Sequence, residues 1–273
     1  MVLAVKTDDA MLKSLIFFVC LWLPSVQAEK YIVASQNFNY YPHYNFQSQT
    51  DKGFIWAMLQ EFSKFSGHQF IYNTMPVLRL QRELEKGNID LVYPDNPLFN
   101  DNKIFAKGKY YSDTIVCTLG GAMVKSSRLG KPISEIVRLS IPLGFTPQLG
   151  WESLIDAQQV TLIPVVTPMA ELQLLALDRV DAAEVDYFVS QYQLQNNPEF
   201  NQFKFDPRLP HSKVEFKLST IKQTRLIDEI NDFVRTHPTL INELKLQYGI
   251  FEPELILQKL HKLSSHNTSQ ILP

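Results

Sequence analysis

Rings and polar side chains gather in one short stretch of this sequence, residues 38–46. Five of its nine residues are Phe or Tyr, one is His and one is Pro, which suits neither a regular strand nor a helix and predicts a loop. Tyr41, His43 and Tyr44 can stack on a flat or cationic group. We expect Phe38 and Phe46 to pack at the edge of the fold instead, and for the two tyrosines such packing is the alternative to binding.

A second group of candidate residues follows a β-rich run at residues 89–93. Tyr93, Asp95 and Asn96 stand at its carboxyl end, where ligands of open α/β sheets bind. Asp95 and Asn96 can contact a ligand there directly. The alternative is ordinary turn chemistry, since Pro, Asp and Asn build turns.

The third group lies in the second half of the chain. Asp186 ends a β-rich run at residues 180–185, and we expect Glu184 to point to the other side of that strand and to lie at the surface. Thr146 stands in a Gly-containing loop, residues 144–148, before a short helix whose first backbone N–H groups can hold an anion. An ordinary strand-to-helix loop is the alternative.

No spacing in the sequence indicates catalysis or metal binding. His43 has no second His or Cys at ligand distance along the chain, and no nucleophile is paired with a base. We therefore expect no catalytic residue, no metal ligand and no cofactor.

Two consecutive α/β units must position these residues. Strand-like runs alternate with segments of helical periodicity from residue 30 to 93 and again from 139 to 185, which predicts mainly parallel sheets covered by helices. We expect a first lobe at residues 29–115 plus 215–250 and a second lobe at 119–212, linked by two crossing strands. Residues 251–273 are expected to be a C-terminal extension with a disordered tail from residue 264.

The first 28 residues have the order of a secretory signal. Lys13 precedes an apolar run of about nine residues, and Val26-Gln27-Ala28 offers a cleavage site. The run is too short to span a bilayer, which needs ~20 residues. We expect cleavage near Ala28, with translation starting at Met1 or Met11, and a periplasmic protein. Its one remaining cysteine, Cys117, cannot form an internal disulfide.

The mature chain has an ordinary globular composition, with 45% hydrophobic residues and a net charge of −2 over the full sequence. Nothing in it is basic enough to indicate nucleic acid as a partner.

The sequence resembles the bacterial extracellular solute-binding proteins, family 3 type, of polar amino acid uptake systems. The resemblance runs from about residue 31 to 249. It rests on the aromatic loop at 41–46, the Leu-x-x-Gly-x-x-Asp pattern at 84–90, its counterpart Leu-Asp-Arg-Val-Asp-Ala at 177–182, and Tyr248-Gly249. It implies a two-lobed periplasmic-binding-protein type II fold with a two-strand hinge, which closes on a small solute and delivers it to an ABC importer. It also implies that Asp186 pairs with a ligand ammonium.

The chain departs from this family after Asn96. Amino acid binders carry a Thr and then an Arg there, which grip the ligand carboxylate as a bidentate pair. This chain has neither, and Lys103 can replace the Arg only as a point charge. An ordinary α-amino acid is therefore in doubt, and a solute with positive charge or several donors is expected.

The sequence favours a monomeric binding protein for a small, amine-bearing or amino acid-like solute. Two alternatives remain open. Similar folds host enzymes such as dehydratases, and a sensing or degenerate member would act through a membrane partner instead of an importer.

Overall fold

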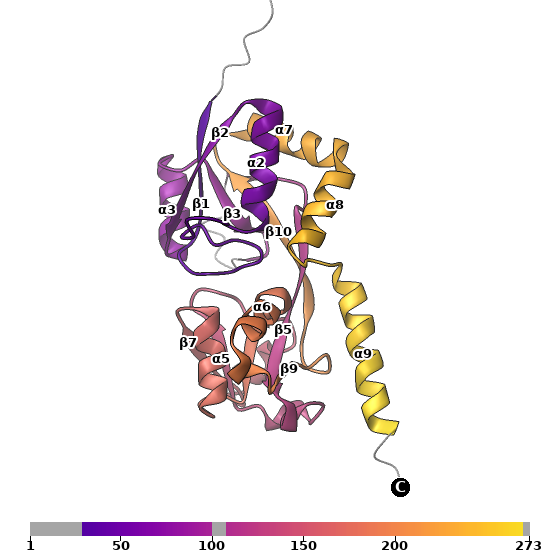
Figure 1. Cartoon of the computed structure of the whole chain (residues 1–273). Coiled ribbons are helices and arrows are strands. Elements are labelled where there is room, and N and C mark those ends of the chain that lie inside the picture. The colour runs from indigo at the N-terminus through magenta and orange to yellow at the C-terminus, as the bar shows by residue number, and fades with distance from the viewer. Residues whose placement is uncertain (1–28, 100–107, 270–273) are drawn as a thin grey trace, which may run out of the picture.

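The computed structural model describes residues 29–99 and 108–269. It places them in two lobes stacked end to end, with helix α9 along one side (Figure 1). The expected signal sequence and Lys103 lie outside the described residues. In the described part no helix is long and apolar enough to cross a bilayer.

The first lobe is built from both ends of the described chain. Its elements are β1 (Lys30–Gln36), α2 (Phe54–Ser66), β2 (Gln69–Met75), α3 (Val77–Lys86), β3 (Leu91–Asp95), β4 (Tyr110–Tyr111), α7 (Thr224–Thr236) and α8 (Pro238–Gln247). Strand β1 pairs in parallel with β2 and β3, as the strand–helix alternation predicted. Helix α7 buries the apolar residues Leu226, Ile227, Ile230 and Phe233, whose spacing places them on one helical face.

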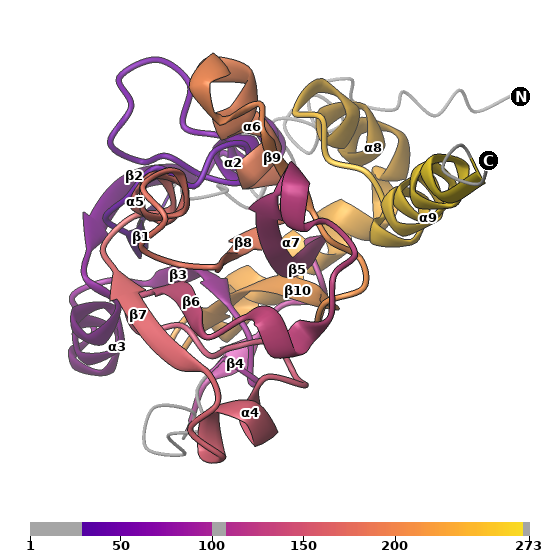
Figure 2. The same cartoon turned by 90° about the horizontal axis from the view of Figure 1, so that it is seen from below.

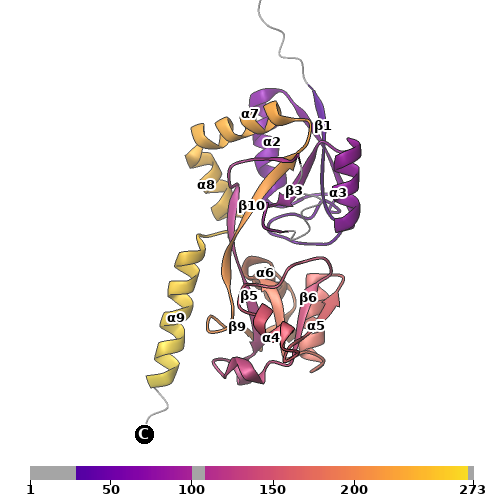
Figure 3. The same cartoon turned by 180° about the vertical axis from the view of Figure 1, so that it is seen from behind.

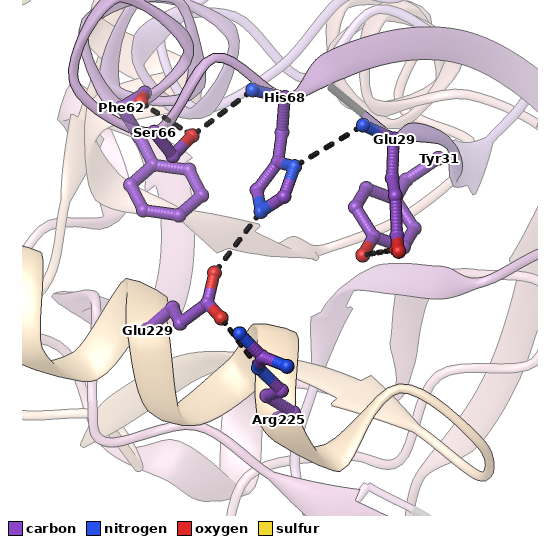
Figure 4. A network of polar contacts seen from close by, with 7 residues as sticks. All are labelled: Glu29, Tyr31, Phe62, Ser66, His68, Arg225 and Glu229. Carbon is purple, nitrogen blue, oxygen red and sulfur yellow. Dashed lines mark hydrogen bonds and ion pairs between the residues drawn. The ribbon is translucent and has the colours of Figure 1, made fainter. Parts of the chain in front are cut away.

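A polar network ties the N-terminal segment of the first lobe to α7 (Figure 4). The His68 ring lies between the backbone N–H of Glu29, at 3.4 Å, and the Glu229 carboxylate, at 3.0 Å. Glu229 also accepts a hydrogen bond from Arg225 at 2.9 Å. Segments about 160 residues apart are thus joined in one lobe.

The second lobe repeats the same plan. Its elements are β6 (Arg138–Pro142), α4 (Glu152–Asp156), β7 (Thr161–Val165), α5 (Pro168–Ala176), β8 (Ala182–Asp186), α6 (Tyr187–Asn196) and β9 (Phe203–Phe205), with 3₁₀ turns at Ser126–Arg128, Ile133–Glu135 and Pro198–Phe200. Strand β6 pairs in parallel with β7 and β8. Helices α5 and α6 cover one face of this sheet and α4 lies on the other (Figure 2).

Two long strands, β5 (Val116–Lys125) and β10 (Ser212–Thr220), run from one lobe into the other (Figure 3). They pair with each other in antiparallel fashion, β10 also pairs with β3 of the first lobe, and β5 pairs with β8 of the second. The resulting strand order is β2-β1-β3-β10-β5-β8-β6-β7. This is the two-strand link expected near residues 115–119 and 214–218.

Helix α9 (Pro253–Ser269) corrects one expectation. The chain stays helical to Ser269, whereas the polar residues from 264 onward predicted a disordered tail. The helix is anchored at its first turns, where Ile256 is buried and Leu257 and Leu260 pack against the core. A helix with such an anchor can continue through residues of modest helix propensity.

Candidate functional site

A cavity of about 650 Å³ lies between the two lobes. Both lobes and the linking strands contribute to its wall, and its volume is in the range of small-molecule sites. Apolar groups cover much of it, namely Tyr40, Val77, Leu98, Phe99, Phe145, Leu149 and Phe216. The polar side chains in the wall are Gln36, Gln81, Asp95, Asn96, Thr118, Thr146, Gln148, Glu184, Asp186, Ser212, Lys213 and Glu215.

Four of the expected site residues line this cavity. Asp95 and Asn96 come from the end of β3, Thr146 from the loop after β6, and Asp186 from the end of β8. Strand ends of both lobes therefore face one another across the cavity, as the rule for open α/β sheets predicted. Whether these four contact a ligand stays a prediction.

The aromatic residues that the sequence singled out do not line the cavity. Tyr93 and Tyr44 are fully buried, and Tyr44 donates a hydrogen bond to Gln36 at 2.6 Å. Tyr41 instead donates to Asp51 at 3.1 Å and packs on Tyr192 with ring centroids 4.5 Å apart. The loop directs Tyr41 and Tyr44 away from the cavity, and Tyr40 is the loop tyrosine that lines it.

Gly53 explains how the aromatic loop folds so tightly. Its φ is +90°, a conformation that favours glycine. A Cβ at this position would lie 2.8 Å from Tyr44 Cα and 2.9 Å from the Pro42 carbonyl oxygen. Phe38 and Phe46 are buried beside this loop, which confirms their expected packing role.

His43 is also absent from the cavity wall, but it reaches across to the second lobe. Its ring is fully buried, and Nε2 lies 3.2 Å from Asp186 Oδ1 and 3.3 Å from Thr118 Oγ1. Thr118 donates to the other oxygen of Asp186 at 2.5 Å. Asp186 Oδ1 further accepts the Val189 N–H at 3.0 Å and so caps helix α6.

Further contacts hold the lobes against each other. The Phe145 ring of the second lobe packs on Phe38 and Tyr40, with centroids 6.1 and 6.2 Å away. Thr146 Oγ1 donates to the Phe99 carbonyl oxygen at 3.3 Å. The structure is therefore a closed arrangement of the two lobes around the cavity.

Asp95 belongs to a buried ion pair. Lys109 Nζ lies 2.6 Å from Asp95 Oδ2, and the two side chains are 3% and 2% exposed. Ser219 also donates to Oδ2 at 2.6 Å, and the Asn96 N–H donates to Oδ1 at 2.8 Å. Asn96 in turn holds the Glu215 carbonyl oxygen and the Leu98 N–H, which is the turn chemistry named as the alternative.

The position of Glu184 corrects a further expectation. Its side chain was expected at the surface, but the residue is 6% exposed and lines the cavity. Residues 184 and 186 are two apart on a strand, and side chains at that spacing share a face. That alternation is the signal that would have found Glu184 from the sequence.

One of the loop N–H groups expected to hold an anion before α4 is used within the protein. The Gln148 N–H donates to Glu184 Oε1 at 3.1 Å. The Gln148 side chain accepts a hydrogen bond from Ser212, which links this loop to β10. In the described part of the chain, no group of three or more His, Cys, Asp or Glu residues is arranged to hold a metal ion.

Comparison with known proteins identifies the fold. No protein-family model matches the sequence, and no curated protein matches it. Among solved structures, an ancestral arginine-binding protein bound to arginine is 16% identical with a TM-score of 0.64, over 80% of this chain and 97% of that chain. The chain has the two-lobed fold of periplasmic binding proteins.

Proteins with other roles share this fold. The GluR0 ligand-binding core in complex with L-glutamate has a TM-score of 0.66 at 13% identity, over 81% of this chain and 99% of that chain. A histidine kinase sensor domain with similarity to periplasmic binding proteins has a TM-score of 0.63 at 13% identity, over 82% and 98%. These likenesses show the architecture, and the solute must be argued from this chain's own residues.

Proposed function

We propose that this chain is an exported binding protein that encloses a small polar solute between its lobes and delivers it to an ABC importer. The observation that carries the proposal is the cavity of about 650 Å³, to which both lobes and both linking strands contribute. Strand-linked lobes can open to admit a solute and close over it, as in the domain closure of periplasmic binding proteins.

The charges of the cavity wall favour a solute with positive charge or several donors. Four carboxylate residues line the described wall, Asp95, Glu184, Asp186 and Glu215, against one cationic residue, Lys213. Lys213 is itself paired with Glu254 at 3.3 Å. No arginine of the described residues lines the cavity to grip a carboxylate.

We propose binding without catalysis. Three of the four wall carboxylates, Asp95, Asp186 and Glu215, contact a cation or a histidine of this chain. These contacts engage the three carboxylates with groups of this chain, which supports a structural role for them.

Sensing through a membrane partner is the second candidate, supported by the likeness to a histidine kinase sensor domain. Both roles need the same solute cavity and differ in the partner of the closed protein. Pull-down from membranes with and without bound solute would separate an importer from a kinase.

A thermal-shift screen of residues 29–273 tests the proposed function. The panel comprises arginine, glutamine, glutamate, agmatine, putrescine, small organic acids and small sugars. A ligand present at a hundredfold excess over its dissociation constant stabilises the folded protein by ~2.7 kcal/mol, so a melting-temperature rise of several degrees is expected for the amine-bearing compounds. A flat response to the whole panel would contradict the proposal.

A further inference from the structure

Glu184 is a buried acid in the cavity wall with one oxygen unused. Its Oε1 accepts the Gln148 N–H at 3.1 Å, while Oε2 is buried without a hydrogen-bond partner. The indole N–H of Trp151 is near enough to lower the pKa of Glu184, but Trp151 Nε1 also completes no hydrogen bond. Buried carboxyl oxygens without partners are rare, because desolvating them costs free energy.

The other carboxylates of the wall are already paired. Asp95 has Lys109 at 2.6 Å, and Glu215 has Lys217 at 3.1 Å. Asp186 is occupied on both oxygens, by His43, by the Thr118 hydroxyl and by the first turn of α6. The position expected to bind a ligand ammonium is thus filled by this chain's own side chains.

Burial makes the ionised form of Glu184 costly and raises its pKa to about 8. Glu171 of α5, also buried, faces it, and the pKa of Glu171 is raised well above its usual range, by burial first and by Glu184 second. Tyr40 of the aromatic loop faces both acids, and burial raises its pKa as well. Asp186 of β8, and Lys213 and Glu215 of β10, are the other charged groups of these two strands in the same wall.

We propose that Glu184, rather than Asp186, is the carboxylate that binds the positive group of the solute, an ammonium or a guanidinium. The inference rests on the proposed binding function and names its recognition residue. An incoming cation displaces the proton of Glu184, which passes to the solvent, and the resulting carboxylate pairs with the cation inside the closed cavity. The cation thereby supplies the partner that Oε2 lacks.

Proton release gives a direct test, because a purely structural Glu184 would not produce it. Titration calorimetry of residues 29–273 with agmatine and with arginine, at pH 7 in phosphate and in Tris, counts the protons exchanged. With burial raising its pKa to about 8 in the described arrangement of the lobes, Glu184 is mostly protonated at pH 7, so most of one proton should be released per ligand. Affinity should rise as the pH increases from 6 to 8, by up to tenfold per pH unit, and level off above 8.

Two variants complete the test. Glu184→Gln keeps the shape and removes the ionisable oxygen, so it should weaken binding at least tenfold and abolish proton release. Glu152→Gln, on the exposed surface of α4, is the matched control and should bind like the unmodified protein. Thermal melts of each variant confirm folding. If Glu184→Gln does not fold, the number of protons released by the unmodified protein still shows whether Glu184 loses its proton when the ligand binds.

The outcomes separate the inference from the proposed function. Binding of agmatine or arginine without proton release, or with equal strength in Glu184→Gln, overturns the assignment of Glu184 and leaves the binding function standing. Binding restricted to anionic or neutral compounds also overturns it. If no compound of the thermal-shift panel binds, the proposed function fails, and the inference fails with it.

Discussion

Replacing Lys109 by Met should lower the free energy of unfolding by about 3–5 kcal/mol. The change leaves the Asp95 carboxylate, 2% exposed, without the cation that lies 2.6 Å from it. Ser219 and the Asn96 N–H still donate to Asp95, but neutral donors do not replace a full charge in a buried site. Urea denaturation followed by circular dichroism measures the loss.

Lys64→Met is the matched control for this prediction. Lys64 forms an ion pair with Glu61 at 2.7 Å, but its side chain is 71% exposed. Exposed pairs contribute little, so the control should change stability by less than about 1 kcal/mol. Equal effects of the two substitutions would show that the Lys109–Asp95 pair is not a buried charge pair.

Replacing Asp186 by Ala should lower the free energy of unfolding by about 2–4 kcal/mol. Loss of the α6 cap contributes ~1 kcal/mol. The Thr118 hydroxyl and the His43 ring, both buried, lose their acceptor, which costs about 1–3 kcal/mol. Asp186→Asn retains an oxygen that can cap the helix, so its effect should be smaller.

A double-mutant cycle measures the energy of the hydrogen bond between Thr118 and Asp186. Thr118→Val preserves shape and removes the hydroxyl that donates to Asp186. Its effect and that of Asp186→Ala should be non-additive by about 0.5–3 kcal/mol, since both remove the same hydrogen bond. Strict additivity would contradict the contact between β5 and β8.

Local patterns made most of the architecture predictable. Helical spacing between residues 30 and 93 predicted helices such as α2, and the repeated strand–helix order predicted two parallel units. The β-rich runs near residues 115 and 214 marked the two strands that link the lobes. Each of these signals lies within one element or between neighbouring elements.

The candidate site was less predictable, because its contacts are non-local. His43 and Asp186 are 143 residues apart, and no pattern in either segment indicates that the two side chains contact each other. Glu184 was misplaced for a different reason. Both faces of β8 are buried, so the strand has no solvent face on which Glu184 could lie.

A distance measured between the two lobes tests whether they close on a solute. Glu85 on α3 and Gln173 on α5 are exposed, and the two helices lie on the same side of the molecule, one in each lobe (Figures 1 and 3). Spin labels at these positions, with Cys117→Ser to remove the native thiol, report the separation by pulsed electron resonance. The compound that raises the melting temperature most should convert a broad distribution into one narrow, shorter distance. An unchanged distribution with that compound bound would contradict closure as the mechanism.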